Sequence, residues 1–85
     1  MGDTLRLKWR GDEKHQCCSY ASIRHGDYEL LSLRVCTSDD IGAYYEVRDS
    51  AGNGAKHEAS GSENTLRLFA EREAFRILTE AARAP

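Results

Sequence analysis

The sequence predicts an α+β fold: a single antiparallel β-sheet of four to six strands with one C-terminal α-helix packed on one face. Three observations support this fold class. The last stretch of the chain repeats its apolar residues at helical spacing, several earlier stretches alternate apolar and polar residues, and short turn sequences join those stretches. Short turns connect antiparallel neighbours, and 85 residues suffice for one domain, residues 1–85, but not for two.

Residues 70–83 form the predicted helix. Their apolar side chains fall on one side of a helical projection and their charged side chains on the other, with Glu71 as the exception. We expect the apolar side to cover the core of the sheet.

The start of this helix is set by Arg67 and Phe69. Continuing the helix backwards would place Arg67 at the centre of the apolar side, so the helical phase breaks near Phe69. At a period of two, residues 65–69 become a strand with both leucines inward and Arg67 and Phe69 outward. We therefore predict a strand that runs directly into the helix. The alternative is one long helix from Thr65, with Asn64 as its N-cap.

Residues 4–10 alternate cleanly and predict a half-buried strand. Its inward face carries Leu5, Leu7 and Trp9, and its outward face carries Arg6, Lys8 and Arg10. The polar residues 11–14 then form a turn.

Residues 25–28, His-Gly-Asp-Tyr, are the strongest turn signal. Gly-Asp between two strand-like runs fits a two-residue hairpin loop. Such a loop places His25 opposite Tyr28, so the residue numbers of every pair of cross-strand partners add up to 53. This register sets Arg24 opposite Glu29, as a cross-strand ion pair, and Cys17 opposite Cys36. A β-bulge would shift these pairs.

Two further segments complete the predicted sheet. Residues 43–49 alternate again and predict a strand, and the Asn-Gly pair within residues 50–54 is typical of a tight turn. Residues 56–59 are either a short return strand or a loop. The predicted core comprises Leu5, Leu7, Trp9, Tyr20, Leu31, Leu33, Val35, Tyr45, Val47, Leu66, Leu68, Ala74, Phe75, Ile77, Leu78 and Ala81.

One amphipathic helix covers one face of a sheet, so the other face is open to solvent or to a partner. The open face is predicted to be basic, with Glu46 as its single acid, although the chain has a net charge of −2. Arginines among aromatic residues suit an acidic protein surface or single-stranded nucleic acid. The plainer reading is that long basic side chains cover apolar sheet surface and protect its edges. The predicted partner-binding residues are Arg6, Lys8, Arg10, Arg34, Tyr44, Arg48, Arg67 and Phe69.

We therefore expect a small non-enzymatic interaction module. It binds an acidic protein partner or self-associates, through the open face or through a sheet edge, and an edge-to-edge dimer avoids bringing like charges together. The first alternative is a single-stranded nucleic-acid-binding domain that uses the same face, although no RNP-type motif is present. The second is a small Cys/His metal-binding protein. The sequence has neither a phosphate-binding loop nor an activated nucleophile, so it gives no indication of an enzyme, and we expect no cofactor.

Three residues, His15, Cys17 and Cys36, are the candidates for a metal site. His15 and Cys17 share a face of a strand, and the predicted register places Cys36 beside Cys17. A fourth ligand is missing, so we predict no metal site. The same register allows a Cys17–Cys36 disulfide under oxidising conditions.

Composition indicates a soluble cytoplasmic protein. Hydrophobic residues make up 40% and charged residues 31% of the chain, which is ordinary for a globular domain. No apolar run approaches the roughly 20 residues that cross a bilayer, so we expect no membrane partner. An odd number of cysteines, three, favours a reducing compartment. The polar N-terminus excludes a signal peptide if the chain is complete.

Overall fold

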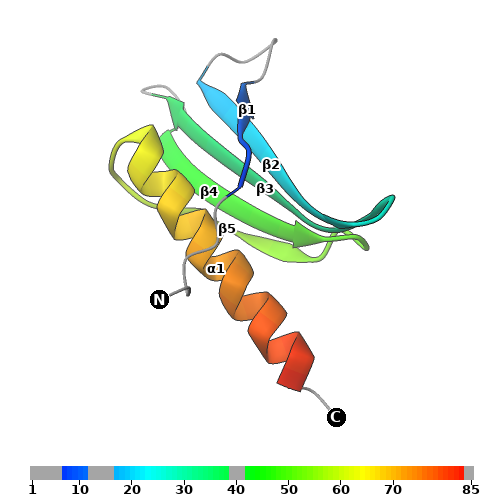
Figure 1. The fold of residues 1–85 in the computed structure, drawn as a ribbon. Helices are drawn as coiled ribbons and strands as arrows, with labels where there is room; N and C mark the ends of the chain where they lie inside the picture. Colours follow the sequence, from blue (N-terminus) through cyan, green and yellow to red (C-terminus); the bar gives the residue numbers. More distant parts are fainter. Residues whose placement is uncertain (1–6, 12–16, 39–41, 84–85) are drawn as a thin grey trace, which may run out of the picture.

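A computed structural model describes residues 7–11, 17–38 and 42–83 of the chain. Its elements are, in order, β1 (Arg10–Gly11), β2 (Cys18–His25), β3 (Tyr28–Ser38), β4 (Gly42–Asp49), β5 (Gly54–Glu58) and α1 (Glu63–Arg83). Within the described residues, five strands form one sheet in the order β1-β2-β3-β4-β5, and each pairs antiparallel with the next (Figure 1). The predicted α+β class is confirmed.

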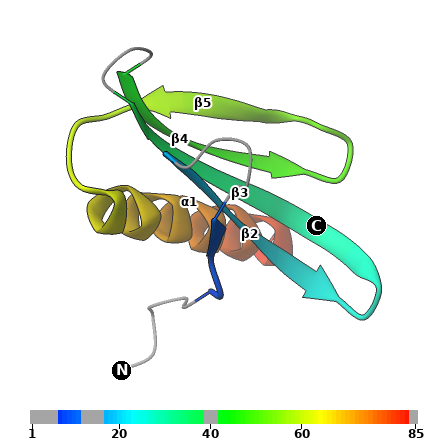
Figure 2. The ribbon, with the colours of Figure 1, turned by 90° about the horizontal axis from the view of Figure 1, so that it is seen from above.

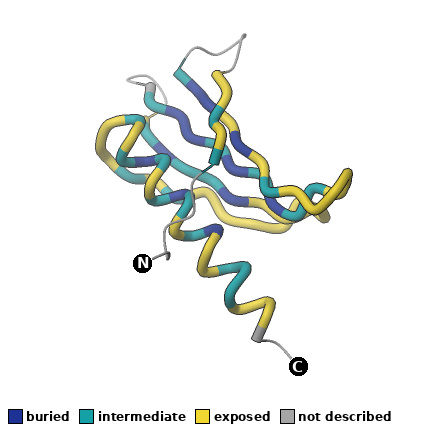
Figure 3. The backbone as a smooth tube through the Cα atoms, in the orientation of Figure 1, coloured by how far each residue is buried: buried dark blue, intermediate teal, exposed yellow. Residues whose placement is uncertain are grey.

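Helix α1 covers one face of this sheet. It contacts β3 and β4, and Figure 2 shows it lying along one side of the strands. The buried residues alternate with more exposed ones along the strands, as Figure 3 shows. The core between helix and sheet consists of Ala21, Leu31, Leu33, Val35, Val47, Leu66, Ala70 and Ala74. The C-terminal end of α1 projects past the sheet, so its last turns contribute less to the core (Figure 1).

The start of the helix differs from the prediction. Helix α1 begins at Glu63, so the predicted strand over residues 65–69 is wrong. The alternative of one long helix is closer, but its N-cap is Ser62 and not Asn64. The Ser62 hydroxyl accepts a hydrogen bond from the backbone N–H of Thr65 at 3.2 Å, which satisfies one of the free donors of the first turn.

Arg67 is compatible with the sheet-facing side of the helix because it has three partners there. Its Nε donates to the hydroxyl of buried Ser19 at 3.3 Å, and its Nη2 donates to Glu63 one turn earlier at 2.7 Å. Its guanidinium also lies 5.5 Å from the centre of the Trp9 ring. Glu71, the other charged residue on this side, accepts a hydrogen bond from Trp9 Nε1 at 2.9 Å. Trp9 of the N-terminal segment therefore contacts both charged residues, Arg67 through its ring and Glu71 through its Nε1.

The predicted strand over residues 4–10 is wrong at residues 7–9, which are not in a strand, and is confirmed only at Arg10. Residues 4–6 lie outside the described residues, and β1 contains only Arg10 and Gly11, opposite Tyr20 and Ser19. Leu7 and Trp9 are not in a strand but still pack against the core, as their inward positions predicted.

The predicted hairpin is confirmed, with Gly26-Asp27 as its loop and a positive φ of 64° at Gly26. Arg24 lies opposite Glu29 as predicted, but the next pair is Ile23 with Leu31, so Leu30 has no partner in β2. This is a β-bulge, and every pair beyond it is shifted by one residue.

The bulge changes which side chains of β2 face the helix. Ala21 turns into the core, whereas Tyr20, predicted to be buried, is 38% exposed on the other face. It also makes Cys18, not Cys17, the residue opposite Cys36.

Three more residues of the predicted core are exposed. Leu68 and Phe75 lie two and nine positions from buried Leu66, which places both on nearly the opposite side of α1. Ala81 lies beyond Leu78, the last helical residue that packs against the core. Leu5 is outside the described residues. The remaining predicted core residues are buried or partly buried against the core. The undecided segment 56–59 contributes most of strand β5.

Candidate functional site

The face of the sheet opposite α1 has a regular arrangement of side chains. Its central cross-strand row contains one residue from each strand: Arg10, Tyr20, Arg34, Glu46 and Lys56. Residues that are direct cross-strand partners lie on the same face of a sheet, so these five side chains form one line across it. We call this side of the sheet the open face.

Two rows flank the central row on the open face. One contains Cys18, Cys36, Tyr44 and Glu58, and the other contains Ser22, Ser32, Arg48 and Gly54. Successive residues of a strand point to opposite faces, so rows two positions away share the same side.

Cations on the open face contact aromatic rings and one carboxylate. The Arg34 guanidinium lies 5.4 Å from the centre of the Tyr20 ring, and the Lys56 ammonium lies 4.3 Å from that of Tyr44. Arg48 Nη2 donates to Glu46 at 2.8 Å. That hydrogen bond, reinforced by the charge of the carboxylate, raises the pKa of Arg48 above its ordinary value.

The predicted binding residues do not all share this face. Arg10, Arg34, Tyr44 and Arg48 do, although Tyr44 is 7% exposed and offers little surface to a partner. Arg67 and Phe69 belong to α1 and lie on the other side of the sheet, which corrects the predicted surface. The reason is the helix start at Glu63. Arg6 lies outside the described residues.

Lys8 and Arg10 line a hollow at the edge of the sheet, beside β2. The hollow has a volume of about 390 Å³ and is lined by Lys8, Arg10, Gly11, Tyr20, Ala21, Ser22 and Arg24. Three of these residues are basic and none is acidic. We call it the basic hollow. Glu29 approaches it from β3, where its carboxylate accepts a hydrogen bond from Ser22 at 2.7 Å.

The basic hollow runs along an unpaired part of β2. β1 pairs only with Ser19 and Tyr20, so beyond Tyr20 the outer edge of β2 pairs with no other described strand. The Thr37 N–H donates to the Cys17 carbonyl at 2.9 Å, which makes that pair a hydrogen-bonded one. Hydrogen-bonded and non-hydrogen-bonded pairs alternate along an antiparallel ladder, so Ser22, five residues after Cys17, belongs to a non-hydrogen-bonded pair. Its backbone N–H and C=O therefore point away from β3, towards the hollow.

The predicted binding residues did not include Arg24 and Lys56. Arg24 was expected to be neutralised by Glu29, but its Nη2 donates to the backbone carbonyl of Asp27 at 2.9 Å. Lys56 belongs to residues 56–59, for which the sequence allows either a strand or a loop. The alternation of Lys56 and Glu58 was the signal that could have placed it on the open face.

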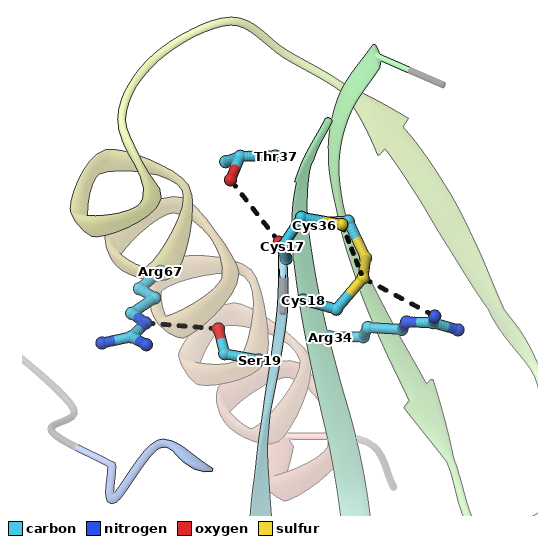
Figure 4. Close-up of a disulfide and its surroundings, with 7 residues drawn as sticks. All are labelled: Cys17, Cys18, Ser19, Arg34, Cys36, Thr37 and Arg67. Atoms are coloured by element: carbon cyan, nitrogen blue, oxygen red, sulfur yellow. Dashed lines mark hydrogen bonds between the residues drawn. A yellow bond between two sulfur atoms is a disulfide. The ribbon is translucent and has the colours of Figure 1, made fainter. Parts of the chain in front are cut away.

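A disulfide joins Cys18 and Cys36 on the open face (Figure 4). The two residues form a non-hydrogen-bonded pair, in which side chains of neighbouring strands come closest. Cys36 is therefore not a thiolate ligand, and His15 lies outside the described residues. Among the described residues, no group of three His, Cys, Asp or Glu side chains is placed to hold a metal ion. The Cys17–Cys36 pair considered from the sequence is wrong by one residue because of the bulge.

Comparison with known proteins identifies no relative. No protein-family model, curated protein or solved structure matches the chain. In the part of the chain that the structure describes, no helix combines the length and the apolar character needed to cross a membrane. The cytoplasmic location stays a prediction, and the disulfide weighs against it because disulfides persist in oxidising compartments. The fold by itself does not indicate a function, because one fold can carry many unrelated sites.

Proposed function

We propose that the protein is an interaction module that binds an acidic, extended segment of a partner protein at the outer edge of β2. The segment adds to the sheet as a further strand, and its carboxylates lie among the three cations of the basic hollow. This mode of recognition combines backbone hydrogen bonds, which give affinity, with side-chain contacts, which give specificity.

The observation that carries the proposal is the charge of the basic hollow. Lys8, Arg10 and Arg24 line it without an acidic residue, in a chain whose net charge is −2. Lys8, Arg10 and Arg24 are all exposed. Cations around a concave surface attract and orient an anionic partner, and this attraction weakens as salt is added.

The unpaired edge of β2 supports the addition of a strand at this position. An exposed strand edge presents unpaired N–H and C=O groups that pair readily with another chain. Here that edge and the three cations border the same hollow. A nucleic acid would use the cations but not the strand edge, so the edge favours a protein segment.

The proposal is tested by fluorescence anisotropy with a labelled peptide of alternating threonine and glutamate. Its threonines suit a strand and its glutamates suit the basic hollow. A peptide of alternating proline and glutamate has the same charge but lacks the backbone donors of a strand, and it should bind much more weakly. Equal binding of the two peptides would contradict strand addition, and tighter binding of a labelled single-stranded oligonucleotide would favour the nucleic-acid alternative.

Charge reversal locates the binding site. Arg10→Glu and Arg24→Glu should each raise the dissociation constant about tenfold, because each replaces an attraction by a repulsion. Lys56→Glu is the matched control. It changes the net charge equally and lies in the same cross-strand row as Arg10, at the opposite edge of the sheet. An equal loss of affinity in all three variants would mean that only net charge matters, which would refute the proposed site.

A further inference from the structure

We propose that Cys17, Cys18 and Cys36 form a thiol–disulfide exchange site, in which Cys17 is the thiol that exchanges with small thiols of the glutathione class. Two of the three sulfurs are already bonded to each other, and the third is in contact with one of them. This site is independent of the proposed peptide binding.

The free thiol of Cys17 lies against the disulfide. Its Sγ is 3.8 Å from the Sγ of Cys18, and Cys17 is the hydrogen-bond donor because a disulfide sulfur carries no proton. The position of Cys17 is held by the ladder, since its carbonyl accepts a hydrogen bond from the Thr37 N–H at 2.9 Å. A thiolate formed at Cys17 is therefore already beside the sulfur that it would attack (Figure 4).

Burial separates the roles of the three cysteines. Cys18 is 3% exposed and Cys36 is 0% exposed, whereas Cys17 is only partly buried. A small thiol in solution can approach Cys17 but not the disulfide itself. Reduction of the buried disulfide in the folded protein therefore needs a relay through Cys17.

Arg34 is the positioning residue of this site. Its Nη2 lies 3.8 Å from the Sγ of Cys18, so Cys18 receives contacts from both a thiol and a guanidinium. A guanidinium stabilises a nearby thiolate and makes that sulfur a better leaving group. Tyr44 packs beside Cys36 and shields it from solvent.

The exchange has three steps, and its atoms and electrons balance. First, the Cys17 thiolate attacks Cys18 Sγ, the Cys17–Cys18 bond forms, the Cys18–Cys36 bond breaks, and Cys36 takes up the proton that Cys17 released. Second, an external thiol attacks Cys17, and Cys18 leaves as a thiolate beside Arg34 and is protonated. Third, a second external thiol attacks the mixed disulfide and leaves Cys17 as a thiol. The sum converts two small thiols into one small disulfide and reduces one protein disulfide.

The test measures how fast reduced glutathione reduces the folded protein, by quenching samples with N-ethylmaleimide and identifying the labelled cysteines by mass spectrometry. Cys17→Ser should slow reduction of the Cys18–Cys36 bond about tenfold, because the intramolecular relay is lost. Urea unfolding of this variant checks that its stability is unchanged. An unchanged rate of reduction would overturn the proposal.

A second measurement needs no variant. Wild-type protein without reductant, labelled in mildly alkaline buffer, should yield some molecules with a Cys17–Cys18 bond and label on Cys36. Label confined to Cys17 would overturn the first step.

Arg34 is tested against a matched arginine of the same face. Arg34→Gln should slow reduction several-fold and Arg34→Lys should restore part of the rate, whereas Arg48→Gln should leave it unchanged. Equal rates for Arg34→Gln and Arg48→Gln would remove Arg34 from the site.

Discussion

Replacing Arg67 with alanine should destabilise the protein by about 2–4 kcal/mol, far more than is usual for an arginine that is partly exposed. The substitution removes the donor that contacts the hydroxyl of Ser19, which is fully buried. Leaving a buried hydroxyl without its partner costs about 1–3 kcal/mol. Losing the contact with Glu63 costs about 0.2–0.5 kcal/mol, and losing the contact with the Trp9 ring costs about 0.5–1 kcal/mol.

The assay is urea unfolding followed by far-UV circular dichroism, with the disulfide intact. Arg72→Ala is the matched control, because Arg72 is an exposed arginine of the same helix, and it should change stability by less than about 0.5 kcal/mol. A double-mutant cycle with Ser19→Ala should give a coupling energy of about 1 kcal/mol between Arg67 and Ser19. Equal effects of the two arginine substitutions, or additive effects in the cycle, would show that Arg67 does not link the helix to β2.

Two further predictions concern the sheet. Removing the disulfide by Cys18→Ala with Cys36→Ala should lower the free energy of unfolding by about 3 kcal/mol, because the bond closes a loop with a sequence separation of 18 residues; urea unfolding checks this, and an unchanged midpoint would contradict it. Gly54→Ala should destabilise by roughly 1–3 kcal/mol, since a Cβ there would lie 2.1 Å from the carbonyl oxygen of Val47. Gly11→Ala, where a Cβ meets nothing within 4 Å, is its control, and equal thermal midpoints for the two glycine variants would refute the steric argument.

The fold class could be predicted because its signals are local. Alternation along the strands, the Gly26-Asp27 loop and the helical spacing near the C-terminus each depend on residues close in sequence. The helix start could not be predicted in this way. Arg67 is tolerated on the sheet-facing side because of Ser19, which is 48 residues away, and no local pattern contains that contact.

The bulge is the second feature that local reasoning could not supply. The loop sequence set the first two pairs of the hairpin correctly, but nothing in the sequence marks Leu30 as the extra residue. A shift of one residue exchanges the two faces of β2. It therefore changed both the predicted disulfide partner and the burial of Tyr20.

The candidate site was predicted only in part. Arg34 and Arg48 were placed together correctly, because β3 and β4 pair without interruption. Arg67 and Phe69 were placed on the wrong side as a consequence of the helix start. The basic hollow was not predicted, since it depends on where β1 ends beside β2.

An NMR titration shows residue by residue whether an acidic extended segment adds to the outer edge of β2. Isotope-labelled protein is titrated with the threonine–glutamate peptide, and the backbone amide shifts are followed residue by residue. We expect the largest changes at Ser22, Arg24 and Arg10, together with slowed amide exchange at Ser22 as its N–H gains a partner. Changes concentrated on β5 or on α1, with β2 unaffected, would contradict it.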